Sequence, residues 1–318
     1  MATGSEAGDP EESAGGPTGV IDTIGLGFAV LNRRPYLIWV PVLLDLLIWL
    51  GGRVVAIAPM SVVRTGLDDE RRIYERTDDI ELMSMMSAVV PTFLSHPSVD
   101  IDAVRVGEQL WSFDGFDGLV LALMAFGVAI ITATLHLMIV GRLVRDVPVG
   151  TRTLLGDCLA AFFHAVSLIP ISLAILLFMM TPVLLVAGGL WIVGVEPVTL
   201  IVLSALLLGG WLALFFVFAV PAFALGYRNV LPALRSSYQV VQHHTLAVIG
   251  LLAIVLVIHL GTPYALSVFT ESIWSVPFAI VVHAYVVTGL LASIMLFFQH
   301  RDPGSVPIRI GTPPVASS

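Results

Sequence analysis

The stretch AVSLIPISLAILLFMMTPVLLVAGGLWIVGVEPVTLIVLSALLLGGWLALFFVFAVPAFALG, residues 165–226, contains a single charged side chain, Glu196. A helix needs about 20 mostly apolar residues to cross a bilayer, so this block is too long for one crossing. The segment 188–197, which contains glycines and the glutamate, divides it into two predicted spans, 165–187 and 198–226. This pattern is typical of a helical hairpin in a membrane.

The composition of the whole chain also indicates a membrane protein. Of 318 residues, 57% are hydrophobic and 12% are charged, whereas a soluble domain has about 45–50% apolar and about 25% charged residues. This excess excludes a soluble enzyme domain, a secreted disulfide scaffold and a disordered protein. All 15 basic residues are arginine, and without a long basic run nothing indicates nucleic-acid binding. The absence of lysine suggests a GC-rich bacterial genome.

Four further apolar stretches complete a predicted all-α bundle of six transmembrane helices. They are 35–52, 118–141, 245–265 and 274–298. The expected membrane domain is 19–300. The ends 1–18 and 301–318 are rich in glycine, proline and small residues, and we predict that they are disordered cytoplasmic tails.

The arginines predict that both termini are cytoplasmic, because cytoplasmic loops retain Lys and Arg. With the N-terminus inside, nine arginines fall on the cytoplasmic side: Arg33, Arg34, Arg142, Arg145, Arg152, Arg228, Arg235, Arg301 and Arg309. The two short outer loops, 188–197 and 266–273, contain none. The longer segment 53–117 is predicted to be a helical extracytoplasmic insertion that caps the bundle, with at least one helix within 66–90.

Short amphipathic helices are predicted before three of the spans, at 20–31, 151–163 and 229–243. Each has one apolar stripe suited to lie in the membrane interface. The alternative is that they simply extend the spans. With the spans, they suggest three repeats of an interfacial helix followed by a two-span hairpin, the first repeat carrying the insertion 53–117.

Polar residues inside the predicted spans are the candidate binding residues, since ionisable groups there are rare. At 1.5 Å per residue, Asp45, His259 and His283 all lie in the outer half of the bundle. A buried carboxylate can pair with an imidazolium, so Asp45 is predicted to face the interior with His259 or His283 as its nearest ionisable partner. The favoured alternative is that each group bonds a neighbouring backbone or interfacial water.

Catalytic and metal-binding motifs are missing from the chain. There is no HExxH, GxSxG, Walker A or CxxC pattern, so no catalytic residue, cofactor or metal is predicted. In FDGFDG, residues 113–118, two carboxylates are too few for a calcium loop; a turn and helix cap is favoured, with Asp117 near the positive end of the next span. Cys158 is the only cysteine, which excludes an intrachain disulfide.

Two runs carry a family resemblance, GFAVLNRRPYLIWVPVLLDLLIWLGGR (27–53) and PALRSSYQVVQHHTLAVIGLLAIVLV (232–257). They resemble uncharacterised bacterial multi-pass membrane proteins, namely YciC-type inner-membrane proteins and the membrane domain attached to some glycerophosphodiester phosphodiesterases. The resemblance covers most of the membrane portion and brings no agreed catalytic residues. The chain has no separate soluble phosphodiesterase domain.

We therefore expect a non-enzymatic, multi-pass integral membrane protein of the bacterial cytoplasmic (inner) membrane. It is expected to act through interaction with membrane lipids or with a membrane protein, either a partner or a second copy of itself. The alternative is a small-solute or proton-linked transporter that uses Asp45, His259 and His283. A cavity reaching past Asp45 would favour that alternative.

Overall fold

The computed structural model describes most of the membrane portion of the chain and parts of the segment 53–117. The described residues are 19–51, 53–57, 79–81, 92–94, 96, 99, 106, 110–146, 151–227, 229–271 and 274–302. Apart from residues 301 and 302, the predicted tails 1–18 and 301–318 lie outside this part of the chain, so their disorder stays a prediction.

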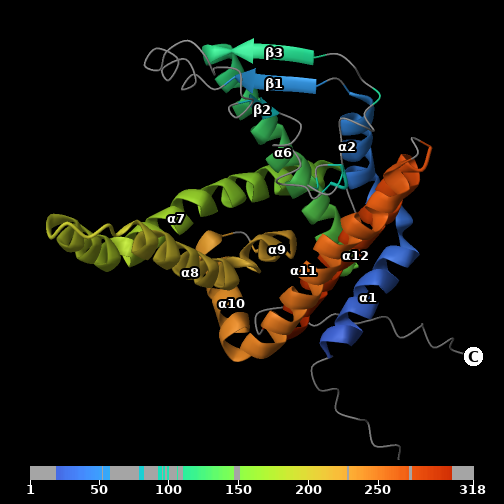
Figure 1. Cartoon of the computed structure of the whole chain (residues 1–318). Coiled ribbons are helices and arrows are strands. Elements are labelled where there is room, and N and C mark those ends of the chain that lie inside the picture. Colours follow the sequence, from blue (N-terminus) through green and yellow to red (C-terminus); the bar gives the residue numbers. More distant parts are fainter. Residues whose placement is uncertain are drawn as a thin grey trace, which may run out of the picture.

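Helices dominate the described chain, with a small sheet at one end (Figure 1). In chain order the elements are α1 Val20–Arg33, η1 (a 3-10 helix) Pro35–Ile38, α2 Trp39–Leu50, β1 Arg53–Ile57, β2 Asp79–Glu81, β3 Leu110–Asp114, α6 Gly115–Val144, α7 Thr151–Ile192, α8 Val198–Phe216, α9 Ala219–Ala224, α10 Val230–His243, α11 Thr245–Ser267, η2 Val268–Glu271 and α12 Val276–Arg301.

Five described segments are long and apolar enough to cross a membrane. They are Val120–Val144, Gly156–Ile192, Val198–Ala224, Thr245–Ser267 and Val276–Arg301. These segments coincide with the last five predicted spans, so length and composition make the chain a multi-pass helical membrane protein. The first predicted span, 35–52, corresponds to a shorter apolar segment, Pro35–Leu50.

The separate short helices depend on local breaks in the chain. Pro35 disfavours helical geometry at the residue before it, and Arg34, with φ −142° and ψ 66°, ends α1. A break at His244 likewise separates α10 from α11. The predicted helices at 20–31 and 229–243 are therefore confirmed as distinct elements.

The predicted separate helix at 151–163 is wrong, because α7 is one helix of 42 residues. Pro170 and Pro182 lie inside it without ending it, since membrane helices tolerate prolines where other groups satisfy the freed carbonyls. The alternative interpretation, in which this segment extends the span, is the one observed.

The span 198–226 is broken near its end, where α8 gives way to α9. Pro221 lacks the N–H that would bond the carbonyl of Val217. Ser237 of α10 satisfies two other backbone groups at this break, because its Oγ donates to the Phe215 carbonyl at 2.6 Å and accepts from the Phe218 N–H at 3.2 Å. The break thus fixes α10 against α8 and α9.

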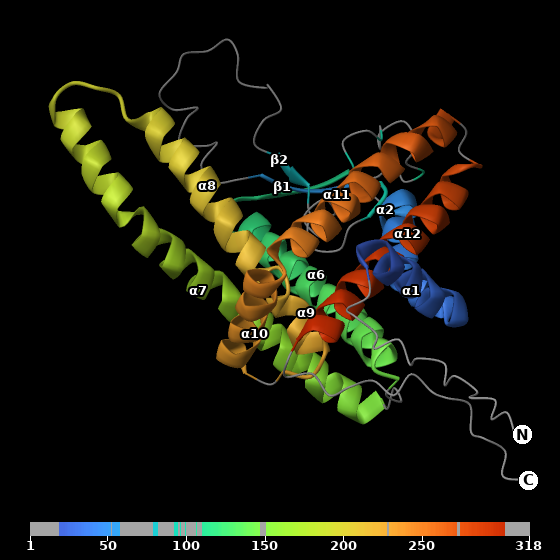
Figure 2. The same ribbon diagram turned by 90° about the horizontal axis from the view of Figure 1, so that it is seen from below.

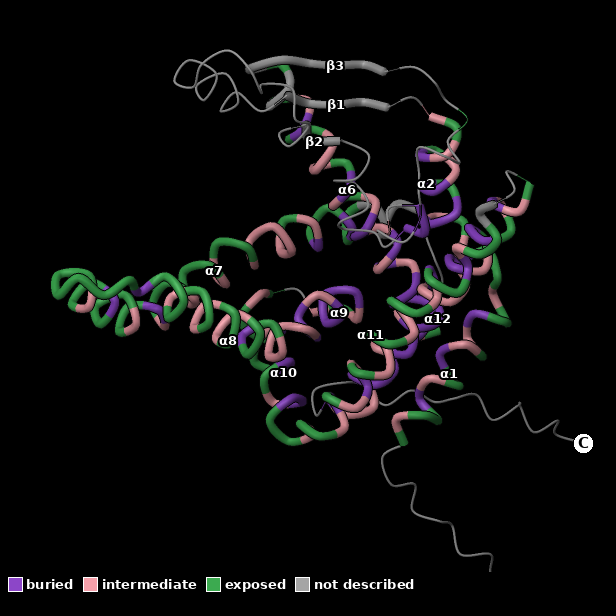
Figure 3. The backbone as a smooth tube through the Cα atoms, viewed as in Figure 1, coloured by how far each residue is buried: buried purple, intermediate pink, exposed green. Residues whose placement is uncertain are grey.

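The centre of the packed body is α12, whose residues are mostly buried (Figure 3). The N-terminal segment runs along it: α1 contacts its second half and α2 its first half. A Cβ built on Gly27 of α1 would lie 2.8 Å from the Gly289 carbonyl and 2.7 Å from the Ser293 nitrogen. Gly289 and Ser293 are thus small residues that let α1 approach α12 closely.

A three-stranded sheet in order β2-β1-β3 replaces part of the predicted helical insertion. β1 pairs antiparallel with β2, with Val55 opposite Glu81, and parallel with β3, with Arg53 opposite Leu110. Within 66–90, Asp79–Glu81 form β2, where pairing with the β-branched strand β1 outweighs local helix propensity. A helix elsewhere in 66–90 stays a prediction. The rest of 66–90 lies outside the described residues. As expected of a helix cap, Asp117 lies in the first turn of α6.

The α7–α8 hairpin projects away from this body, as Figures 1 and 2 both show. Only 6% of the most apolar window of each of these spans is buried, compared with 61% for α12. In a membrane protein such a face is covered by lipid or by another membrane protein.

Candidate functional site

Asp45, on α2, is fully buried, and its carboxylate binds a turn of the segment 53–117. Oδ2 accepts a hydrogen bond from the Phe93 N–H and Oδ1 from the Leu94 N–H, both at 3.0 Å. Within the part of the chain that the structure describes, no ion pair joins Asp45 to a histidine. Asp45 therefore matches the alternative interpretation, in which the polar group bonds a neighbouring backbone.

The two predicted histidines do lie together, beside the turn that Asp45 holds. The His283 ring centroid is 6.3 Å from that of His259 and 5.8 Å from that of Phe93. His283 is buried, and neither ring nitrogen has a hydrogen-bond partner among the described residues. His96 stacks edge-on against Tyr264 close by. Phe93 thus links Asp45 to His283 indirectly, through its backbone and its ring.

Sequence reasoning missed this turn, which lies in the segment 53–117. The signal available was a short apolar run, Phe93–Leu94, between Thr92 and Ser95. Its partner Asp45 is 48 residues earlier in the chain. No group of three His, Cys, Asp or Glu that could hold a metal ion occurs in the described ranges.

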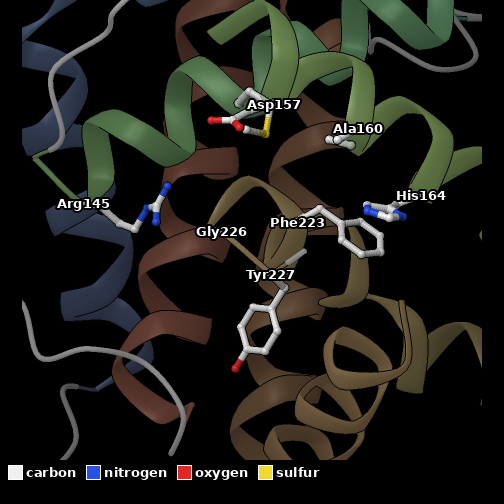
Figure 4. Close-up of a pocket in the computed structure, with 9 residues that line it drawn as sticks. Arg145, Asp157, Ala160, His164, Phe223, Gly226 and Tyr227 are labelled. Atoms are coloured by element: carbon white, nitrogen blue, oxygen red, sulfur yellow. The ribbon is translucent and has the colours of Figure 1, made fainter. Parts of the chain in front are cut away.

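A second site is a hollow of about 590 Å³ where the end of α6, the start of α7 and the end of α9 meet (Figure 4). We call it the Arg145 hollow; it is lined by Met138, Arg145, Asp157, Ala160, Ala161, His164, Phe223, Gly226 and Tyr227. Apart from His164, its polar residues lie at the ends of three candidate spans. Arg145 follows the last residue of one, Asp157 is the second residue of the next, and Gly226 and Tyr227 follow the third.

The charges around the Arg145 hollow leave one guanidinium without a full set of partners. Arg142 donates to Asp157 Oδ2 at 2.5 Å, which neutralises that carboxylate. The Nε of Arg145 is buried and has no hydrogen-bond partner in the described chain. Burial lowers the pKa of Arg145, the nearby Arg142 lowers it further, and Asp157 raises it. An arginine side chain nevertheless stays protonated in proteins, so Arg145 brings a positive charge to the lining of the hollow.

Local structure fixes the other walls of the hollow. Gly226 has φ +101°, a conformation that favours glycine, and it lies against the guanidinium, since a Cβ there would be 2.6 Å from Arg145 Nη1. The Tyr227 hydroxyl donates to Asp302 Oδ2 at 2.6 Å. Burial raises the pKa of Tyr227, and this hydrogen bond raises it further. His164 stacks on Phe223 with ring centroids 5.3 Å apart.

This arrangement suits an anionic group that can accept several hydrogen bonds, because a guanidinium presents a planar fork matching phosphate or carboxylate. Sequence reasoning used Arg142 and Arg145 only to predict topology. The hollow was missed because its walls come from helices far apart in the chain. Its composition alone carries no motif.

Neither the Arg145 hollow nor the Asp45 turn is assigned by likeness to a known protein. No protein-family model, curated protein or solved structure matches this chain.

Proposed function

We propose that this chain is a non-enzymatic membrane protein that acts by binding membrane lipid in the Arg145 hollow. The observation that supports this most is the partly buried Arg145 side chain at the ends of three candidate spans, since its buried Nε lacks a partner in the described chain. Lipid headgroups lie at this depth of a bilayer. Their phosphates offer the acceptors that an arginine fork requires.

The proposal includes the finer topology, with six spans and both termini in the bacterial cytoplasm. Pro35–Leu50 is then a short sixth span, and nine arginines lie on the cytoplasmic side. The Arg145 hollow would face the cytoplasmic leaflet. Of the three suggested repeats, α10–α11–α12 keeps a separate short helix before its two spans. In the repeat that contains α7 and α8, the short helix and the first span form the single helix α7.

A partner protein or a second copy of this chain is part of the same proposal. The α7–α8 hairpin exposes large apolar side chains, among them Phe178, Leu185 and Leu206. Lipid alone can cover them, so the lipid interaction does not depend on this assembly.

Anionic lipid should stabilise the purified protein more than zwitterionic lipid. Phosphatidylglycerol at about 100 times its Kd adds about 2.7 kcal/mol to the folded state, and phosphatidylcholine should add far less. The melting temperature in detergent, measured with each lipid at equal concentration, checks this. Equal melting temperatures with the two lipids would reject the proposed lipid preference.

Proton-linked transport is the second candidate, because His283 is buried with both ring nitrogens unpartnered in the described chain. Against it, Asp45 is already occupied by two backbone N–H groups. We expect liposomes containing the protein to hold an imposed pH gradient as long as protein-free liposomes do. A faster collapse that His283→Gln slows would favour transport instead.

A further inference from the structure

A second hollow, of about 580 Å³, lies between α7 and α8, next to the Arg145 hollow. We call it the apolar groove. Its lining is Ala165, Leu168, Ile169, Ser172, Leu173, Leu176, Gly209, Leu212, Ala213, Phe216 and Val220. Apart from Ser172, no side chain in this lining is polar. The groove therefore suits a hydrocarbon chain.

The two hollows share one continuous face of α7. The residues of α7 that line them are Asp157, Ala160, Ala161, His164, Ala165, Leu168, Ile169, Ser172, Leu173 and Leu176. Steps of three and four residues keep side chains on one face of a helix. The opposite wall is also continuous, because Phe216 and Val220 line the groove and Phe223 lines the Arg145 hollow.

The polarity along this face follows that of a membrane lipid. The charged end lies at the ends of three candidate spans, whereas the apolar groove lies wholly within two of them. From Ala165 to Leu176 the helix rises about 16 Å at 1.5 Å per residue. That is close to one leaflet of a hydrocarbon core about 30 Å thick.

Space in the groove comes from a glycine that the helices do not need for packing. A Cβ on Gly209 would meet no atom of the described chain within 4 Å. By contrast, a Cβ on Gly141 of α6 would lie 2.6 Å from the Ala224 carbonyl. Gly209 therefore does not serve close packing of the described helices, and it leaves the groove open.

We infer that the Arg145 hollow and the apolar groove form one site for a single anionic phospholipid. The phosphate contacts Arg145, and one acyl chain of the same molecule lies between α7 and α8. This inference rests on the proposed function and names its ligand class. Headgroup and chain are recognised together, so a phosphate without a chain binds only the charged half.

Two pairs of matched variants test the two halves of the site in the full-length protein in detergent. Arg145→Gln removes the guanidinium, and Arg33→Gln removes an exposed arginine outside both hollows. Gly209→Leu fills the groove, and Gly210→Leu places the same side chain on the neighbouring exposed glycine. The probes are phosphatidylglycerol, phosphatidylcholine and glycerol 3-phosphate, with binding measured by native mass spectrometry.

Phosphatidylglycerol should bind about tenfold more weakly or worse to both variants, since Arg145→Gln loses the phosphate contact and Gly209→Leu occupies the space of the acyl chain. Both control variants should match the wild type. Glycerol 3-phosphate should respond to Arg145→Gln and not to Gly209→Leu. Unchanged phosphatidylglycerol affinity in Gly209→Leu would overturn the single site while the lipid proposal stands. A wild-type protein that does not prefer phosphatidylglycerol over phosphatidylcholine would overturn the proposed function itself.

Discussion

Asp45→Leu should lower the stability of the folded protein by about 3 kcal/mol or more. Its carboxylate accepts the N–H groups of Phe93 and Leu94, and all three residues are buried. Leucine would leave both donors unsatisfied, at about 1–3 kcal/mol each. Asp45→Asn keeps one acceptor oxygen, so it should lose about half as much. Thermal melting in detergent gives the ranking.

The matched control for Asp45 is Asp146→Asn, since Asp146 is an exposed carboxylate that pairs with Arg34 at 2.8 Å. Exposed ion pairs contribute about 0–1 kcal/mol, so this variant should melt close to the wild type. If Asp45→Leu also melts there, Asp45 does not hold the turn at Phe93. If Asp45→Asn is as damaging as Asp45→Leu, the charge matters beyond its two hydrogen bonds.

Gly27→Leu should separate α1 from α12 and destabilise the protein by about 3 kcal/mol. Even a methyl group at Gly27 would lie 2.8 Å from the Gly289 carbonyl and 2.7 Å from the Ser293 nitrogen. These are backbone atoms, which no change of rotamer can move aside. Overpacking of this kind costs about 1–3 kcal/mol, and sometimes more. The melting temperature should fall by about 6 °C or more.

Gly25→Leu, on the same helix, is the control for Gly27. A Cβ on Gly25 meets no atom of the described chain within 4 Å, and the residue is exposed. Replacing an exposed helical glycine gains up to about 1 kcal/mol in helix propensity. Gly25→Leu should therefore melt at or above the wild-type temperature. Similar losses in the two variants would show that close packing on α12 is not the cause.

The sequence predicts features of the fold that depend on neighbouring residues. Hydropathy locates the five long spans, because the requirement for about 20 apolar residues acts on each segment alone. Pro35 marks the end of α1 because a proline restricts the backbone of the residue directly before it. The short helix at 151–163 could not be distinguished from an extension of α7, since Pro170 is compatible with either.

Features that join distant segments were not predictable in this way. The sheet pairs Arg53 with Leu110, and Asp45 binds a turn 48 residues later. Amphipathicity in the segment 53–117 gave no register for these pairings. The histidines could be placed at one depth because helix rise is constant. The helix rise does not show that Asp45 binds two backbone N–H groups instead of a histidine.

The central position of α12 has a consequence for biosynthesis. α1 and α2 pack on a helix that the ribosome makes about 250 residues later, which takes roughly 12 to 50 seconds at 5–20 residues per second. During that time the face of α1 around Gly27 has no permanent neighbour. The α7–α8 hairpin, whose two helices contact each other, can leave the translocon as a finished unit. Membrane chaperones would therefore be needed mainly by the N-terminal helices, and assembly would be completed from the C-terminal end.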